Sequence, residues 1–148
     1  LAGLTLEAAA GWWRERETAV ADGTIGVLVA EAVEEPEPGG VPPAILGCTI
    51  LLRSRNPNAP HRAEVGKVLV DRAWRRRGLG RRLMAAVEAL ARADGRWLLH
   101  LDVTAGTAAE RLYRAAGWTE LGTMPDHSML PDGTLAPTIF FWKDLRAS

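Results

Sequence analysis

The chain has 148 residues, of which 47% are hydrophobic and 24% charged, and its formal net charge is zero. These values are typical of one globular domain spanning residues 1–148. No apolar run approaches the roughly 20 residues of a membrane-spanning helix, so we expect no membrane partner. The zero net charge disfavours nucleic acid as a partner. The single cysteine, Cys48, excludes an internal disulfide and favours a cytoplasmic location.

The first half of the chain predicts one helix followed by three strands. We expect the helix over residues 5–21, which are rich in alanine, can be capped by Thr5 and end at "DG". The strands are expected at "TIGVLVAEA" (24–32), "AILGCTILL" (44–52) and "RAEVGKVLV" (62–70), because apolar and β-branched residues predominate there. Between the first two, the acidic, proline- and glycine-containing residues 33–43 predict a hairpin connection.

The second half alternates helices and strands. Apolar residues recur once per helical turn from Leu79 to Leu90, which predicts a helix over 78–93. Further segments are expected as a strand at 96–103, a helix at 107–117, a strand at 118–124, a long loop at 125–137 and a strand at 138–145. Strand–helix–strand units favour parallel pairing and hairpins favour antiparallel pairing. The order therefore predicts an α/β fold whose mixed sheet has helices packed on its faces.

The junction "DRAWRRRGLGRRLM" (71–84) concentrates positive charge where a strand leads into a helix. The first amide groups of a helix lack partners, and the helix dipole adds positive charge there, so such a junction can bind an anion. Gly78 and Gly80 would let a phosphate approach the backbone. The Walker pattern and the dinucleotide pattern G-x-G-x-x-G are both absent. Two interpretations are open at this point, a pyrophosphate site and a solvated helix start.

Two segments together resemble the GNAT superfamily of acetyltransferases. "RRRGLG" matches its coenzyme A loop, Q/R-x-x-G-x-G/A, and "AAERLYRAAGW" matches its second recurring segment, A-x-x-L/F-Y-x-x-x-G-F/W. The order of elements is similar as well, and the resemblance covers nearly the whole chain. A narrower resemblance, carried by "HRAEVGKVLV", "LLHLDV" and "PDGTLAPTIFFWK", points to the tabtoxin-resistance acetyltransferases, which acetylate a small amine-bearing toxin.

The resemblance implies a mostly antiparallel sheet with a central, splayed pair of parallel strands that holds the pantetheine arm of acetyl-CoA. These strands would be "KVLV" and "LLHLDV". It implies contacts from backbone groups of the first strand, from amides and side chains of the arginine-rich turn, and from the second recurring segment. The residues concerned are Val68, Leu69, Val70, Arg75, Arg76, Arg77, Gly78, Leu79, Gly80, Arg81, Thr107 and Tyr113.

The implied reaction is direct attack of a small-molecule amine on the acetyl thioester, which needs a base because an alkylammonium has a pKa near ~10.4. Glu64 is the first candidate base, and its alternative role is a surface ion pair with Arg62 or Lys67. Asp102 is the second, since a carboxylate inside an apolar strand needs a partner or a function. Tyr113 matches the tyrosine that faces the cofactor sulfur and would act as the acid, or would only pack in the core.

Two departures from the family pattern bear on the site. Gly106 stands where many members have a cofactor-binding asparagine, so Thr107 or backbone groups would replace that contact. The resemblance also implies a first strand and helix, which we do not expect within the sequence as given. His100, on the same strand face as Asp102, could relay a proton, but we expect it to be a buried, satisfied histidine instead. Three histidines and one cysteine show no metal-ligand spacing, so we expect no metal.

Other functions compete with this interpretation. The acceptor could be a protein amine, or the domain could bind coenzyme A without catalysis and serve as an interaction module. A DNA-binding role for the arginine cluster is disfavoured because the cluster is short and the net charge is zero. Members of the family often pair through sheet edges, so the resemblance also implies that a homodimer is plausible.

Overall fold

A six-stranded sheet with the order β1-β2-β3-β4-β6-β5 organises the computed structural model, which describes residues 5–32 and 44–146. Its helices are α1 (Leu6–Arg14), α2 (Glu17–Ala21), the 3-10 turn η1 (Arg72–Trp74), α3 (Leu79–Ala93) and α4 (Ala108–Ala115). Its strands are β1 (Ile25–Glu31), β2 (Ile45–Arg53), β3 (Arg62–Val70), β4 (Leu98–Thr104), β5 (Thr119–Met129) and β6 (Leu135–Asp144). The expected hairpin connection at 33–43 lies outside the described residues.

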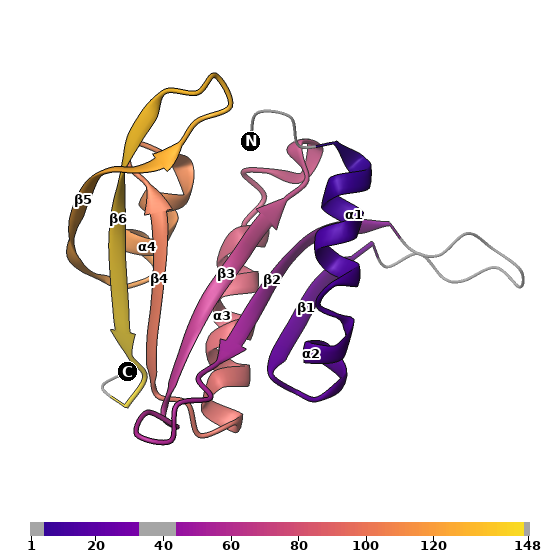
Figure 1. Ribbon diagram of the computed structural model, residues 1–148, viewed down its shortest axis with the longest axis vertical. Helices are drawn as coiled ribbons and strands as arrows, with labels where there is room; N and C mark the ends of the chain where they lie inside the picture. The colour runs from indigo at the N-terminus through magenta and orange to yellow at the C-terminus, as the bar shows by residue number, and fades with distance from the viewer. Residues whose placement is uncertain (1–4, 33–43, 147–148) are drawn as a thin grey trace, which may run out of the picture.

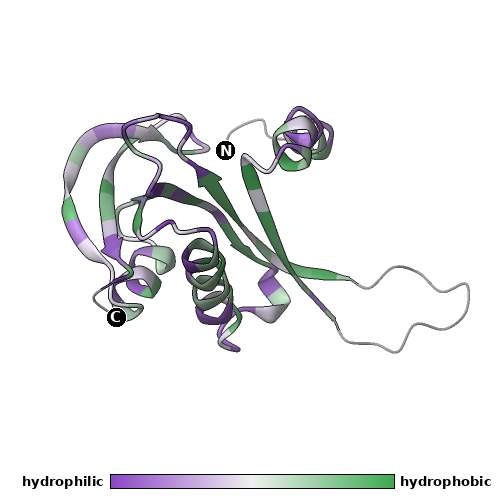
Figure 2. Cartoon of the chain, turned by 90° about the horizontal axis from the view of Figure 1, so that it is seen from below, coloured by the Kyte–Doolittle hydropathy of each residue, from purple (hydrophilic) through white to green (hydrophobic). Residues whose placement is uncertain are grey.

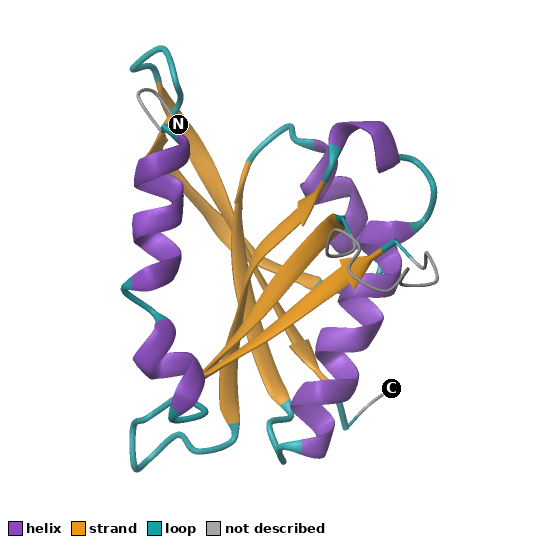
Figure 3. Cartoon of the chain, turned by 90° about the vertical axis from the view of Figure 1, so that its right-hand side faces the viewer, coloured by secondary structure: helices purple, strands orange, loops and turns teal. Residues whose placement is uncertain are grey.

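Every strand pair is antiparallel except β3–β4, which is parallel. The two helix pairs lie on opposite faces of the sheet, α1 and α2 on one and α3 and α4 on the other (Figures 1 and 3). The mixed, mostly antiparallel sheet with helices on both faces is therefore confirmed. On the first face, α1 and α2 lie over β1 and β2, and no helix of the described residues lies over the part formed by β4, β6 and β5 (Figure 1).

The hydrophobic core lies between the sheet and the pair α3 and α4. Alternate residues of the central strands face it, including Leu51, Leu99, Leu101 and Phe141, each at most 2% exposed. Figure 2 shows hydrophobic residues along the central strands and both kinds of residue on α3, as an amphipathic helix requires. Val87 of α3 is fully buried against these strands. Among the described residues, no helix has the length and apolar character needed to cross a membrane.

The predicted helix over 5–21 is divided into α1 and α2. Its start is as expected, because the Thr5 hydroxyl accepts a hydrogen bond from the Ala8 amide at 3.1 Å. The division follows from Arg16, whose guanidinium donates to the Trp12 carbonyl at 2.7 Å and lies 3.5 Å from the centre of the Trp12 ring. This bond satisfies a carbonyl that the last turn of α1 leaves open, so the first helix can end there.

The predicted long loop at 125–137 is wrong. β5 continues to Met129 and β6 begins at Leu135, so only residues 130–134 connect them. The turn-forming residues of "PDHS" are accommodated by a bulge, where the pairing register shifts between Met124 and Ser128 and Asp126 has φ 54°. A bulge leaves extra residues unpaired while the strands continue on both sides, which a reading of turn propensity does not predict.

Candidate active site

The parallel strands β3 and β4 pair over only part of their length. Their register joins Arg62 to Leu98, Ala63 to Leu99 and Glu64 to His100, and beyond these pairs the strands diverge (Figure 1). The second half of β3 keeps β2 as a neighbour through Gly66, Leu69 and Val70. Backbone groups of this half that face β4 therefore have no strand partner. This is the splayed pair that the family resemblance implies, and it opens toward the end of β3 at Val70.

A bulge in β3 accompanies the divergence. The register with β2 shifts between Cys48 and Ile50, and Lys67 adopts the left-handed region with φ 52°. Bulges bend a strand and increase its local twist, so this bulge helps β3 turn away from β4. The Lys67 ammonium lies 4.6 Å from the centre of the Trp12 ring of α1. Sequence reasoning did not find this feature, because nothing in "VGKVLV" marks a lysine for a positive φ.

The arginine-rich turn connects the open end of β3 to α3. Asp71 caps η1 by accepting a hydrogen bond from the Ala73 amide at 2.8 Å. Positive φ values at Arg76 and Gly78, 64° and 79°, then fold the chain sharply into α3. Gly78 is the N-cap of α3 and offers no side-chain bond, so no cap side chain occupies the first amides of the helix. Residues 71–78 are all exposed and Leu79 and Gly80 are half-buried, so the turn through which an anion would approach these amides is open to solvent.

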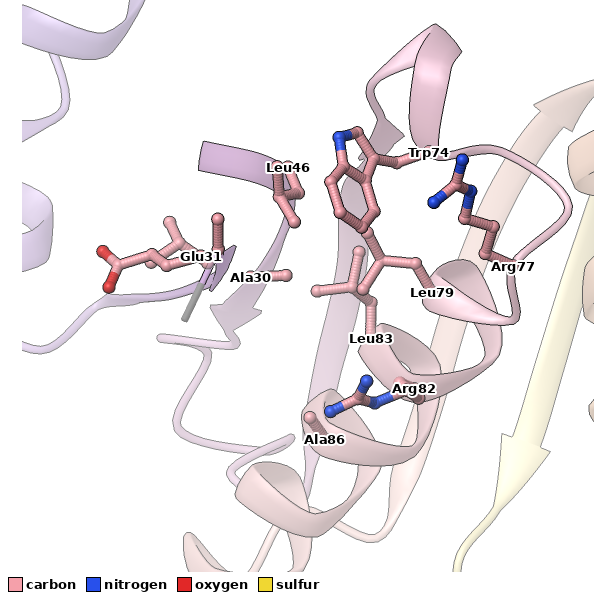
Figure 4. Close-up of a pocket in the computed structure, with 11 residues that line it drawn as sticks. Ala30, Glu31, Leu46, Trp74, Arg77, Leu79, Arg82, Leu83 and Ala86 are labelled. Atoms are coloured by element: carbon pink, nitrogen blue, oxygen red, sulfur yellow. The ribbon is translucent and has the colours of Figure 1, made fainter. Parts of the chain in front are cut away.

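The arginine side chains of the turn do not all point to the gap between β3 and β4. The Arg75 Nε donates to the Val70 carbonyl at 3.2 Å, at the mouth of the gap. The Arg77 guanidinium lies 4.8 Å from the centre of the Trp74 ring. Arg77 and Arg82 border a cavity of about 630 Å³ between α3 and the β1–β2 pair (Figure 4). Arg75 of this cluster thus lies at the gap between β3 and β4, whereas Arg77 and Arg82 lie at the cavity between α3 and the β1–β2 pair.

Gly80 has a packing role that the sequence does not predict. An added Cβ there would lie 3.1 Å from the Leu112 Cδ2 of α4 and 4.0 Å from a methyl of Val70. The missing side chain therefore makes room for the packing of α4, and the contact of the Gly80 backbone with a phosphate stays a prediction. Gly78, in contrast, has nothing within 4 Å of an added Cβ, and its positive φ explains why glycine stands there.

Glu64 lies beside the gap on the face opposite α3 and α4. It is half-buried, and its neighbours on either side, Ala63 and Val65, face the core. Its carboxylate forms no ion pair or hydrogen bond with any residue in the described part of the chain. The alternative role, a surface pair with Arg62 or Lys67, is therefore not supported.

His100 and Asp102 lie on the same face of β4, one opposite Glu64 and the other farther along the diverging half. Both are exposed. The expectations that Asp102 is enclosed in an apolar strand and that His100 is buried are wrong. The cause is the absence of a helix over this face of β4, which the sequence pattern does not reveal, because an apolar strand can face helices on one side only.

Tyr113 lies on α4, on the other face of the sheet, and its side chain is part of the core. It is 5% exposed, and its ring lies 6.1 Å from that of Phe141 and 6.3 Å from that of Trp118. Burial, aided by the negative charge of Asp102, raises the pKa of the Tyr113 hydroxyl to about 12. No residue that the structure describes makes a hydrogen bond to that hydroxyl. The ring packs in the core as expected, while its hydroxyl stays without a local partner.

Thr107 and Gly106 form the start of α4. The Thr107 hydroxyl donates to the Thr104 carbonyl at 2.9 Å and accepts from the Glu110 amide at 3.4 Å. Its one proton is thus used within the chain. The Gly106 amide donates to the Glu110 carboxylate at 2.7 Å, which lowers the pKa of that carboxyl. In the described residues, no group of three or more His, Cys, Asp or Glu side chains is placed to hold a metal ion.

The sequence profile of the Acetyltransferase (GNAT) family matches residues 8–118, and the chain belongs to this family. A curated relative, N-alpha-acetyltransferase 80 of Mus musculus, is 43% identical over 79 residues, which are 53% of this chain and 23% of that protein. The match therefore spans less than a quarter of the length of that relative.

Several solved structures share the fold. Ribosomal-protein-alanine N-acetyltransferase from Brucella melitensis is 27% identical, with a TM-score of 0.72 over 96% of this chain and 80% of that one. The yncA protein of Salmonella typhimurium, solved with its cofactor acetyl-CoA, is 22% identical, with a TM-score of 0.69 over 96% and 75%. An N-acetyltransferase from Staphylococcus aureus is 18% identical, with a TM-score of 0.73 over 96% and 78%. The predicted fold is confirmed by these likenesses.

Proposed function

We propose that this protein transfers the acetyl group of acetyl-CoA to a primary amine of a small molecule. The observation that carries the proposal is the gap between β3 and β4, because an exposed, arginine-rich turn lies at its open end and the carboxylates of Glu64 and Asp102 lie beside it. The resemblance to the tabtoxin-resistance enzymes favours a small acceptor and stays a prediction.

Acetyl-CoA would lie along β3 with its pantetheine arm in the gap and its pyrophosphate at the start of α3. The arm contains amide groups that can bond to the unpaired backbone of residues 68–70 as an added strand would. The amides of residues 76–81 would hold the pyrophosphate. Arg75, already at the mouth of the gap, would add a charge-assisted bond, and Arg77 would do so after leaving Trp74. Thr107 would contribute through its backbone, since its hydroxyl caps α4.

The reaction needs an amine that has lost its proton. Glu64 or Asp102 would accept this proton from the ammonium, directly or through water, and the nitrogen would then attack the thioester carbonyl carbon. The new C–N bond forms, the C–S bond breaks, and the nitrogen releases its remaining extra proton. The balance is one ammonium and one thioester converted to one amide, one thiol and one proton. A backbone amide of Leu69 or Val70 would stabilise the carbonyl oxygen during the attack.

Tyr113 is better suited to donate a hydrogen bond than to transfer its proton. Its pKa of about 12 keeps the hydroxyl protonated at neutral pH. A thiol has a reference pKa near ~8.5, well below that of this phenol, so complete proton transfer from the phenol to a thiolate would be unfavourable. A hydrogen bond to the departing sulfur carries no such penalty and still stabilises the developing charge.

A protein amine is the second candidate acceptor. The identity of 43% over 79 residues to a mouse N-alpha-acetyltransferase favours it, although that match covers only 23% of the relative. The uncovered face of β4 and β6 would admit an extended peptide as well as a small molecule.

The deciding experiment follows release of the coenzyme A thiol with acetyl-CoA and two sets of acceptors, small primary amines and short peptides with free N-termini. Turnover with the small amines supports the proposal, and turnover with peptides alone supports the second candidate. Saturable binding of acetyl-CoA without turnover of either set would indicate a binding domain. Failure to bind acetyl-CoA would contradict all three.

A further inference from the structure

A small cavity adjoins Glu64 at the paired end of β3 and β4, away from the arginine-rich turn. Its volume is about 260 Å³, and its charged and polar lining includes Arg53, Ser54, Arg55, Arg62, Glu64 and His100. Pockets for whole drug-sized ligands usually exceed about 300 Å³, so this one suits a small substituent.

Arg62 is the unusual residue of this cavity. Its Nε atom is buried and has no hydrogen-bond partner, and no carboxylate in the described residues pairs with its guanidinium. A buried polar group without a partner destabilises a fold. The Nε itself is enclosed, so a ligand would bond to the terminal nitrogens of the guanidinium, which also make no hydrogen bond within the described residues.

The two neighbouring arginines differ from Arg62. The Arg53 Nε donates to Asp94 at 2.7 Å, and its terminal nitrogen NH1 donates to the Gly23 carbonyl at 2.7 Å. Arg55 is exposed to solvent and lies 3.9 Å from Asp22, too far for a hydrogen bond. Arg62 is thus the cation of this cavity that is half-buried and whose side chain makes no bond within the described residues.

Strand geometry relates Arg62 to the candidate base. Residues two apart on a strand face the same side with Cα atoms about 7 Å apart, so Arg62 and Glu64 both point away from the core. His100 is paired directly with Glu64 on the same face. A molecule whose amine lies at Glu64 can therefore place a second group, a few bonds away, at the Arg62 guanidinium.

We propose that Arg62 determines acceptor specificity by binding an oxyanion, so that the acceptor is a small amine that also carries a carboxylate or a phosphonate-like group. The inference rests on the proposed function. Guanidinium groups bind carboxylates and phosphates through two parallel hydrogen bonds, which gives both strength and a fixed orientation. Such an anchor would hold the amine at Glu64 in one position.

The test compares acceptors that differ only in charge. The probes are ω-amino carboxylates from glycine upward, their uncharged amides, and the matching aminoalkyl phosphonates. For the best chain length, we expect kcat/KM to be about 10- to 100-fold higher for the carboxylate or phosphonate than for the amide, as expected for a charge-assisted bond. The carboxylate and phosphonate arms decide which oxyanion the site prefers. Equal rates for charged and uncharged acceptors would overturn the inference.

Arg62→Met should remove the preference for charged acceptors and leave rates with amides unchanged, while Arg62→Lys should retain part of it. Arg111→Met, an equal change of charge at an exposed position on α4, is the matched control. Arg62→Met should unfold at the same or a higher urea concentration, since it removes an unbonded buried nitrogen. A loss of stability together with equal rate losses for all acceptors would mean that Arg62 is structural.

Calorimetric titration of the protein saturated with coenzyme A separates this inference from the proposed function. If the protein binds the amino carboxylates and Arg62→Met abolishes this binding, the oxyanion site is supported. If no acetyl transfer occurs in the same experiment, only the proposed reaction is contradicted. Transfer or binding that is indifferent to Arg62 would contradict the inference and leave the proposed reaction standing.

Discussion

Glu88 and Lys143 lie on the face of the sheet covered by α3 and α4, and the chain satisfies them fully. The Lys143 ammonium donates to both Glu88 carboxylate oxygens at 2.9 Å and to the Ala116 carbonyl at 2.7 Å. The Trp118 indole donates to Glu88 at 3.0 Å. On the opposite face, Arg62 and Glu64 bond to no side chain in the described residues.

The difference separates two uses of ionisable residues. The covered pair links α3, the end of α4 and β6, so its energy contributes to the fold. The groups on the open face make no such link, so their presence is better explained by binding and chemistry. Experiments can test this contrast. Substitutions on the covered face should lower the free energy of unfolding, and substitutions on the open face should lower the rate of turnover.

The largest expected effect is loss of turnover on the open face. Glu64→Gln should lower kcat by about 10²- to 10⁴-fold if Glu64 is the base, with stability changed by less than about 0.5 kcal/mol. Steady-state kinetics and urea unfolding measure the two quantities. Glu7→Gln on α1 serves as a control that removes the same charge. Asp102→Asn, made alongside, decides between the carboxylates, and unchanged turnover in both variants would exclude each as the base.

On the face covered by α3 and α4, substitution should lower stability. Lys143→Met should lower the free energy of unfolding by about 3–5 kcal/mol, because Glu88 stays buried with only Trp118 as a partner. Urea unfolding measures the change. Lys67→Met, at an exposed position, should change stability by less than about 1 kcal/mol. If both variants were equally stable, the buried pair would not stabilise the fold.

Gly78 and Gly80, at the start of α3, are expected to differ in how much a substitution costs stability. Gly78→Ala should cost about 1–2 kcal/mol, because its φ of 79° disfavours a Cβ. Gly80→Ala should be nearly neutral, since contact with the movable Leu112 side chain at 3.1 Å offsets the roughly 1 kcal/mol gained in helix propensity. Thermal unfolding tests both. A much more destabilising Gly80→Ala would mean that Leu112 cannot move.

The smallest effect concerns Tyr113, which is the only tyrosine in the chain. The ultraviolet band of tyrosinate should therefore titrate with a midpoint at about 12, and Asp102→Asn should lower that midpoint slightly, since burial is the larger cause. The unfolded chain ionises near pH ~10, so stability should fall as pH rises from there toward 12. Tyr113→Phe should lack this decline. A midpoint near 10 would show that the hydroxyl is solvated.

The sequence predicts the fold well where the spacing of apolar residues and the family motifs indicate the same element. β3 begins and ends as predicted, and α3 begins at Leu79, one residue after its predicted start. Both motifs lie where the resemblance placed them, at the end of the splayed pair and on α4. Local signals suffice there, because an apolar strand, a glycine turn and an amphipathic helix follow one another directly.

Features that depend on distant partners were predicted poorly. The exposure of Asp102 and His100 depends on which face of β4 lacks a helix, and the strand's own residues do not specify that. The packing role of Gly80 depends on Leu112 of α4, which is distant in the sequence. The continuation of β5 through a bulge required the β6 register. Arg62 gave no signal, because a missing hydrogen-bond partner is visible only in three dimensions.

The short pairing of β3 with β4 also divides the sheet into two blocks, β1–β3 and β4–β6–β5, joined along three residue pairs. Backbone hydrogen bonds across that seam are few, so amide hydrogens of the second half of β3 should exchange faster with solvent than those at the centre of either block. A pantetheine arm bonded to the seam would slow that exchange. Binding of acetyl-CoA would then couple the local opening of the two blocks, so that they unfold as one cooperative unit.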